Sequence, residues 1–190
     1  MPIDFIKEAV TSRKTIGALM PSSSQLSLAI VKTAEVSHSH SVIELGPGTG
    51  VITAQIEKRL SKQAKFFAIE LSSCLADSVR KDFPNLTVYN GCATEIEKYM
   101  SIHGMTECDT VISGLPWVSF PQPMQTCMLD AIVSVLPKGG TFVTFAYLGV
   151  HLLPAGRRIR EMLEKRFSLV HKTEVVWKNV PPAFIYHCTK

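Results

Sequence analysis

A glycine-rich turn after a short apolar run is the clearest candidate for chemistry in the chain. Residues 42–50 read V-I-E-L-G-P-G-T-G and place glycines at Gly46, Gly48 and Gly50. Because glycine has no Cβ, the backbone of such a turn can pass close to a bound nucleotide. The G-x-G-x-G spacing is not the dinucleotide fingerprint, since residues 51–52 continue a helix where a more distant third glycine would fall. A tight strand-to-helix turn without a ligand is the alternative.

An acidic residue follows the turn by twenty positions. Residues 66–70 read F-F-A-I-E, so that a second predicted strand runs up to Glu70. A carboxylate at a strand end can accept hydrogen bonds from both hydroxyl groups of a ribose. One acid in this position is weak evidence by itself. Together with the glycine turn, it predicts a ligand that contains a nucleoside.

Two further segments follow predicted strands. Residues 90–93 read N-G-C-A, and residues 113–117 read S-G-L-P-W. The second segment ends a strand at the carboxyl edge of the expected sheet, where such folds bind their substrates. Tyr147 and His151 come just after the next predicted strand and are candidates for a general base on position alone. A purely structural role is the alternative for both.

The elements that would position these residues alternate between strands and helices. Strands are predicted at residues 41–45, 65–69, 86–89, 110–113, 140–147, 171–177 and 184–188, and helices at 25–35, 51–60, 73–83, 124–136 and 157–166. Such alternation favours βαβ units around a parallel sheet. The last two strands are joined by residues 178–183, which are too few to cross over, so this pair should be antiparallel. The expected fold is a doubly wound α/β sheet, mostly parallel, with helices on both faces and a final antiparallel hairpin.

The composition bounds the class of protein. The chain has 190 residues, of which 46% are hydrophobic and 19% charged, and this suits one domain with a sizeable core. The five cysteines form no CxxC pair, which favours reduced thiols in a cytoplasmic protein. The six histidines lack metal-ligand spacing, so we predict no metal site. The N-terminus has no signal peptide, and residues 139–153 fall short of the about 20 residues of a spanning helix.

An N-terminal segment, residues 1–36, precedes the main domain at residues 37–190. We expect this segment to be helical and to act as a lid or as a membrane contact. A helix that packs on the domain is the alternative. The apolar stripe of the segment is Ile3, Ile6, Ala9 and Val10, with Lys7, Arg13 and Lys14 nearby.

The net charge of +4 is modest, but its distribution is uneven. Residues 157–178 hold seven basic and three acidic side chains, whereas the residues before them are nearly neutral. Arg157, Arg158 and Arg160 could bind a lipid phosphate or an anionic bilayer. A solvated helix face is the alternative.

The glycine turn, Glu70 and the later segments resemble class I S-adenosylmethionine-dependent methyltransferases over about residues 40–190. The resemblance implies a Rossmann-like fold with S-adenosylmethionine as cofactor. The glycines would surround its methionine part, Glu44 would lie near its ammonium group, and Glu70 would bind its ribose. Related families usually have Gly-Asp-Ala where this chain has Cys92, so adenine recognition would depend on backbone and Ala93. The implied cofactor-binding set is Met20, Ser22, Glu44, Gly46, Gly48, Gly50, Glu70, Leu71, Cys92, Ala93 and Ser113.

Residues 113–117 resemble a variant of the Asn-Leu-Pro-Tyr motif of ribosomal RNA adenine dimethyltransferases. The bacterial phospholipid N-methyltransferases, which methylate phosphatidylethanolamine, are more similar, because residues 17–23, 113–117 and 179–183 all match in order. The resemblance implies that carbonyl groups in the motif hold the acceptor amine. Trp117 would line the site and attract the cationic headgroup, unless it is a core or rim aromatic. The implied catalytic set is Ser113, Gly114, Leu115, Pro116, Trp117 and Tyr147.

We therefore expect an N-methyltransferase that acts on phosphatidylethanolamine at an anionic membrane surface, peripheral to its inner face. The alternatives are an RNA adenine N6-methyltransferase, a soluble small-amine methyltransferase and a non-catalytic binding domain. Residues 113–117 lack the Asn of the RNA enzymes' Asn-Leu-Pro-Tyr motif, and we expect no helical domain after the sheet. A nucleic-acid partner is therefore not expected, and the sequence does not indicate an oligomeric state.

Overall fold

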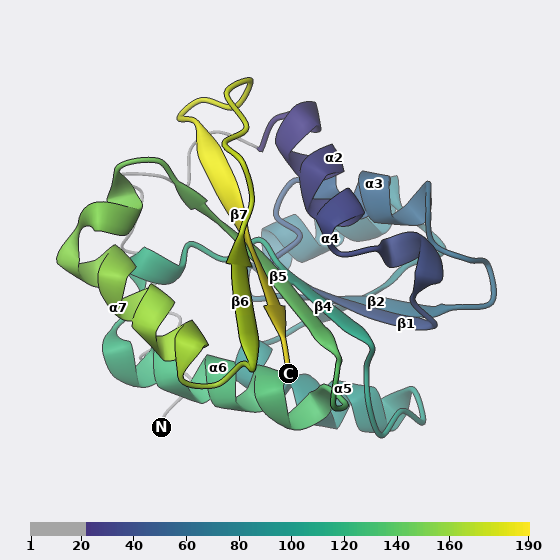
Figure 1. Cartoon of the computed structure of the whole chain (residues 1–190). Helices are drawn as coiled ribbons and strands as arrows, with labels where there is room; N and C mark the ends of the chain where they lie inside the picture. Colours follow the sequence, from purple (N-terminus) through teal and green to yellow (C-terminus); the bar gives the residue numbers. More distant parts are fainter. Residues whose placement is uncertain (1–21) are drawn as a thin grey trace.

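The computed structural model describes residues 22–190, and its strands form a single seven-stranded sheet in the order β3-β2-β1-β4-β5-β7-β6 (Figure 1). Neighbouring strands are parallel, except that β7 runs antiparallel to both β5 and β6. The expected mostly parallel sheet with a final antiparallel hairpin is confirmed. The strands are β1 (Ser41–Leu45), β2 (Lys65–Glu70), β3 (Thr87–Asn90), β4 (Thr110–Ser113), β5 (Thr141–Tyr147), β6 (Leu169–Lys172) and β7 (Ala183–Thr189).

Helices cover both faces of the sheet, as expected. On one face, α2, α3 and α4 bury their apolar sides, and on the other face α5, α6 and α7 do so. Short 3-10 turns join several of these elements. The helices are α2 (Ser24–Thr33), α3 (Val51–Glu57), α4 (Ser73–Asp82), α5 (Ile96–Ile102), α6 (Gln122–Val135) and α7 (Pro154–Glu164), and the 3-10 turns are η1 (Val36–His38), η2 (Ala93–Glu95), η3 (Trp117–Ser119) and η4 (Val150–Leu152).

The strand register brings the candidate site segments to one edge. Leu45, the last residue of β1, lies opposite Ile69 of β2 and Ser113 of β4. Ser113 in turn lies opposite Thr144 of β5. Because these strands are parallel, the segments that follow them all emerge at the carboxyl edge of the sheet.

The sixth strand is shorter and earlier than the predicted 171–177. It spans Leu169–Lys172, and beyond it only an isolated bridge joins Val176 to Ala183. The reason is local: the hydroxyl group of Thr173 accepts a hydrogen bond from the backbone N–H of Ile185 at 3.0 Å. A side chain thus takes the place of a ladder carbonyl, and the chain leaves the sheet. The prediction also missed α5, which forms the crossover between β3 and β4.

Helix α2 packs firmly against the sheet. Leu26 and Ile30 are fully buried in one cluster with Val143 of β5 and Ile185 of β7. The apolar side chains of α2, within the predicted N-terminal segment, are therefore part of the same core as the sheet. The predicted apolar stripe with Lys7, and Met20, lie outside the described residues.

No helix within residues 22–190 has the length and apolar character needed to cross a membrane. Over the same range, the His, Cys, Asp and Glu side chains form no group of three or more that could hold a metal ion.

Candidate active site

The glycine turn joins β1 to α3 with a backbone that other residues would strain. Gly46, Gly48 and Gly50 have φ angles of 70°, 57° and 78°, in the left-handed region that favours glycine. A Cβ on Gly46 would lie 2.7 Å from Cδ2 of Leu115, whereas a Cβ on Gly48 would meet no atom of residues 22–190 within 4 Å. The turn is therefore packed tightly on its inner side and open at Gly48, as close approach of a ligand requires.

Glu70, the last residue of β2, is tied to this turn. One of its carboxylate oxygens accepts a hydrogen bond from the backbone N–H of Gly48 at 3.1 Å, and the other accepts from Ser72 at 2.9 Å. The side chain is only 8% exposed. Each oxygen retains acceptor capacity, because a carboxylate offers about four lone-pair sites. The fixed carboxylate can thus accept hydrogen bonds from two ribose hydroxyl groups.

Glu44 is a buried carboxyl group of which only one oxygen is hydrogen-bonded within residues 22–190. Its Oε2 accepts a hydrogen bond from the hydroxyl of Thr53 at 2.7 Å, but Oε1 is buried and has no partner among residues 22–190. Burial raises the pKa of Glu44 to about 8. A ligand ammonium near Oε1 would satisfy it and favour the charged form. The predicted position near the ammonium of S-adenosylmethionine fits this orphaned atom.

The side chains of Asn90 and Cys92 in the predicted adenine segment, residues 90–93, are engaged in hydrogen bonds within the protein. The side-chain amide of Asn90 donates to the carbonyls of Glu70 and Leu71, at 3.0 and 2.9 Å. Cys92 is 3% exposed, and its Sγ accepts a hydrogen bond from the hydroxyl of Thr94. Cys92 is thus the N-cap residue of η2, and it has no carboxylate that could contact an adenine. Ala93, also buried, follows it in η2.

The segment after β4 is held by Ser113, which is fully buried. Its Oγ accepts hydrogen bonds from the backbone N–H of Leu115 at 3.3 Å and from the indole N–H of Trp117 at 3.1 Å. The carbonyl of Ser113 accepts from the hydroxyl of Thr144. Ser113 therefore shapes the motif from within, and its side chain is already engaged.

The carbonyl of Gly114 is the motif's available acceptor. The carbonyls of Ser113, Leu115 and Pro116 each accept a hydrogen bond from within the chain. The Gly114 carbonyl accepts none from residues 22–190. Its N–H donates to Leu45, and a Cβ on Gly114 would lie 2.6 Å from the carbonyl oxygen of Gly46. The motif and the glycine turn are therefore in backbone contact.

Trp117 is a core aromatic, which corrects its expected role as a wall of the site. Its side chain is 4% exposed and packs edge-to-face against Phe142, with ring centroids 6.0 Å apart. The buried amide of Gln125 donates to the Trp117 carbonyl at 2.8 Å. With its ring in the core, Trp117 supports the motif and offers no open face to a cation.

Comparison with known proteins agrees with this geometry. The family model described as ribosomal RNA adenine dimethylase matches residues 17–116, which include the glycine turn, Glu70 and the motif up to Pro116. The chain is also 30% identical to an ornithine lipid N-methyltransferase of Singulisphaera acidiphila, over 91% of this chain and 88% of that protein. The chain belongs to the ribosomal RNA adenine dimethylase family. It is an S-adenosylmethionine-dependent methyltransferase.

Other members of the family share only part of the chain. A probable ribosomal RNA small subunit methyltransferase A of Thermococcus gammatolerans is 33% identical over 46% of this chain and 28% of its own length. Among solved structures, a TehB-like methyltransferase from Corynebacterium glutamicum has a TM-score of 0.63 at 14% identity, over 99% of this chain and 95% of that one. An O-methyltransferase from Bacillus cereus, in complex with S-adenosylhomocysteine, has a TM-score of 0.67 at 13% identity, over 99% and 90%. These structures share the Rossmann-like methyltransferase fold.

The two candidate bases of this methyltransferase differ in protonation. Tyr147 ends β5 and packs beside Phe145, and burial raises its pKa, so it stays protonated at neutral pH. His151 in η4 has its ring edge-on to Phe184, and its buried Nδ1 has no hydrogen-bond partner in the described part of the chain. Burial, with the charge of Lys172, lowers the pKa of His151. Of the two, only His151 can accept a proton near neutral pH.

The three predicted arginines differ in their side-chain partners. Arg160 is paired with Glu164 at 2.7 Å. Arg158 donates to the buried side chain of Gln125 at 3.3 Å, and thereby joins α7 to the amide that holds Trp117. Arg157 is exposed and has no side-chain partner within residues 22–190. That these arginines bind a lipid phosphate or an anionic bilayer stays a prediction.

Residues outside the sequence prediction hold the site together. Thr53 contacts Glu44, Thr144 contacts Ser113, and Gln125 contacts both Trp117 and Arg158. The contacts of Thr144 with Ser113 and of Gln125 with Arg158 join residues more than 30 positions apart, whereas those of Thr53 with Glu44 and of Gln125 with Trp117 are closer in the chain. Thr53 lies one turn into the helix after the glycines, and this position is the one signal that the sequence offered.

The buried Glu44 makes stability depend on pH. The folded protein keeps this proton up to about pH 8, whereas the unfolded chain loses it near 4.5. The free energy of unfolding contributed by Glu44 should therefore fall as pH rises through this interval. Glu44→Gln cannot ionise, so its stability relative to the wild type should increase from pH 5 to pH 8. Urea unfolding at both pH values measures this, with exposed Glu57→Gln as matched control, and parallel curves for Glu44→Gln and wild type would contradict it.

Proposed function

We propose that this methyltransferase methylates the primary amine of a membrane lipid, with phosphatidylethanolamine as the acceptor. The observation that carries the proposal is the extent of the similarity to the ornithine lipid N-methyltransferase, over 91% of the chain. The family model ends at Pro116, so it leaves out β5, β6 and β7. The similarity to the ornithine lipid N-methyltransferase also extends over the part of the chain that follows Pro116. Ornithine lipid and phosphatidylethanolamine both offer a primary amine on a lipid.

The residues at the carboxyl edge suit this reaction. Glu44, Glu70 and the glycine turn would hold S-adenosylmethionine, which supplies an electrophilic methyl group when bound. The carbonyl of Gly114 would accept an N–H of the acceptor amine and so orient its lone pair. Neutral His151 is the candidate to take up a proton from the lipid ammonium. The free cysteines favour a cytoplasmic enzyme, which we place peripherally on the inner face of the membrane.

An assay with labelled methyl donor tests the proposal. The full-length protein is incubated with liposomes that contain phosphatidylethanolamine, with liposomes that contain ornithine lipid, with ribosomal RNA and with free ethanolamine. We expect label in phosphatidylethanolamine, with products resolved by headgroup. Phosphatidylcholine liposomes are the control, because their headgroup has no N–H to replace.

The other arms identify the alternatives. Label in ornithine lipid alone would support methylation of a lipid amine but would make ornithine lipid, not phosphatidylethanolamine, the acceptor. Label in RNA alone would overturn the proposal in favour of adenine methylation, which the family model makes the second candidate. Label in free ethanolamine alone would indicate a small-amine enzyme.

A further inference from the structure

Exposed apolar side chains gather at one edge of the sheet. Among residues 22–190, seven large hydrophobic side chains are exposed, and five of them lie in two segments, residues 148–153 and 177–180. We call these five the apolar rim: Leu148, Leu152, Leu153, Trp177 and Val180, which are 37%, 59%, 57%, 70% and 69% exposed. Single exposed hydrophobic residues are ordinary, but a cluster of them marks an interaction surface.

The two segments of the apolar rim form one surface. The first follows the carboxyl end of β5, and the second precedes β7, which starts at the same edge because it is antiparallel. The backbone N–H of Leu148 donates to the carbonyl of Pro182 at 2.8 Å, and Tyr147 lies opposite Ala183. Figure 1 shows the loop before β7 projecting beyond the end of the sheet.

This loop is fixed in place by a buried polar residue. Asn179 is 2% exposed, its Oδ1 accepts a hydrogen bond from the backbone N–H of Ser23 at 2.9 Å, and its amide donates to the carbonyl of Pro181. With Asn179 turned inward, its neighbours Lys178 and Val180 are held outward. The hydrogen bonds of Asn179 therefore fix the loop in the conformation that exposes its rim residues.

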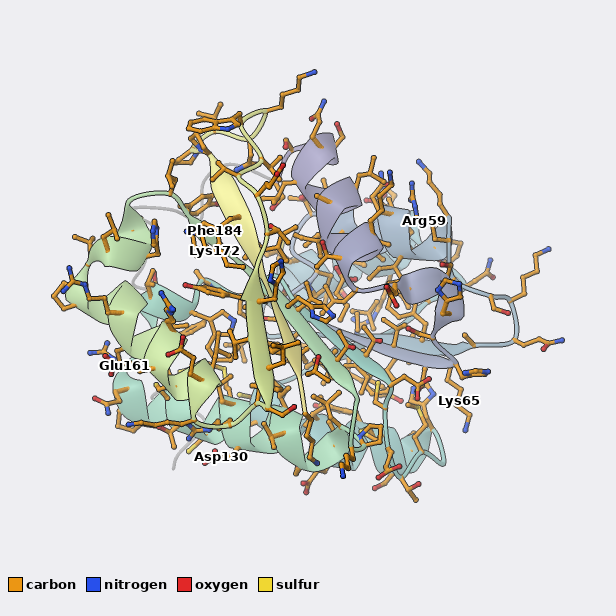
Figure 2. All side chains as sticks on the ribbon, in the orientation of Figure 1. Arg59, Lys65, Asp130, Glu161, Lys172 and Phe184 are labelled. Carbon is orange, nitrogen blue, oxygen red and sulfur yellow. The ribbon has the colours of Figure 1, made fainter. Side chains whose placement is uncertain are left out.

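Basic side chains lie next to both segments of the rim. Lys178 lies between Trp177 and Val180 in the sequence, and Arg157 lies in the first turn of α7, just after Leu153. Figure 2 shows Lys172 with Phe184, and its ammonium lies 4.0 Å from the ring centroid. Tryptophan and aliphatic side chains flanked by basic residues suit the interface of an anionic bilayer.

We propose that the apolar rim is the surface on which this methyltransferase docks to an anionic lipid bilayer. This inference rests on the proposed function, since a lipid acceptor must reach the carboxyl edge. The rim lies at the same edge as the glycine turn and the 113–117 segment, and α7 contacts η3 of that segment. A bilayer at the rim would bring lipid headgroups to the side of the sheet where the methyl donor binds.

Tryptophan fluorescence provides a direct test. The chain has two tryptophans, and Trp117 is buried whereas Trp177 is 70% exposed. With vesicles of phosphatidylglycerol and phosphatidylcholine, which lack the substrate, we expect a blue shift and quenching by brominated acyl chains. Trp177→Phe should abolish both signals. A wild-type emission that does not change with vesicles, or that shifts with protein concentration alone, would overturn the proposal, the latter in favour of a second copy.

Vesicle sedimentation tests the energetics of docking. The double variant Trp177→Ser with Val180→Ser should lose at least about ten-fold in vesicle affinity, because it removes apolar area from the contact. The matched control is Ile102→Ser with Leu169→Ser, which are 64% and 58% exposed at the amino edge of the sheet. This control should bind like the wild type. Equal loss in both double variants, or in neither, would overturn the proposal.

A water-soluble substrate separates this inference from the proposed function. Short-chain phosphatidylethanolamine below its micelle concentration should be methylated equally by the wild type and the rim double variant. If the variant loses this activity too, the rim acts on catalysis and the docking proposal is overturned. If the rim binds vesicles but no lipid is methylated, the proposed function fails and docking stands.

Discussion

Glu70→Ala should raise the dissociation constant for S-adenosylmethionine by about 100-fold or more. The side chain would contribute two charge-assisted hydrogen bonds to the ribose, and each such bond is worth about 1.5–3 kcal/mol. It also fixes the glycine turn, because its oxygens accept from Gly48 and Ser72 at 3.1 and 2.9 Å. Loss of the carboxylate therefore removes ligand contacts and loosens the loop that would carry them. Isothermal titration calorimetry on the full chain measures the change.

A graded variant distinguishes the two contributions. Glu70→Gln keeps one oxygen acceptor of the same shape, so its affinity should lie between those of the wild type and Glu70→Ala. The surface control is Asp82→Ala at the end of α4, with circular dichroism to verify that each variant is folded. An unchanged dissociation constant in folded Glu70→Ala would mean that the carboxylate does not bind the methyl donor.

Gly114→Ala should reduce kcat/KM about 100-fold or more and destabilise the fold by about 1–3 kcal/mol. The new Cβ would lie 2.6 Å from the carbonyl oxygen of Gly46, and neither backbone can yield without moving the other. The change would displace the glycine turn and the Gly114 carbonyl together. Both donor affinity and methyl transfer should therefore decline, as measured by calorimetry and by the lipid assay.

The matched control for this substitution is a glycine with open space around it. Gly139 has a φ of 84°, and a Cβ there would meet nothing within 4 Å. Gly139→Ala should cost about 1 kcal/mol through backbone strain and leave methyl transfer unchanged. If Gly114→Ala were destabilised as expected but retained full activity, the 113–117 backbone would have no part in positioning the acceptor.

Much of the fold was readable because its signals are local. Strands β1, β2 and β4 are short, mostly apolar runs, the turn glycines adopt positive φ, and twenty residues separate the turn from Glu70. The prediction was wrong for the sixth strand, where Thr173 replaces a ladder partner, and it missed α5. Apolar periodicity does not reveal a side chain that ends a strand.

The sequence by itself determined the mostly parallel sheet and the residues at the glycine turn, because those depend on backbone geometry that residue types encode locally, and its resemblance to class I methyltransferases implied the cofactor. Only the tertiary structure decided which polar groups remain available. It places Trp117 in the core, pairs Arg160 with Glu164, leaves Oε1 of Glu44 without a partner within residues 22–190, and exposes Trp177. Burial and hydrogen-bond partners are set by contacts between residues far apart in the chain, and no single segment carries that information.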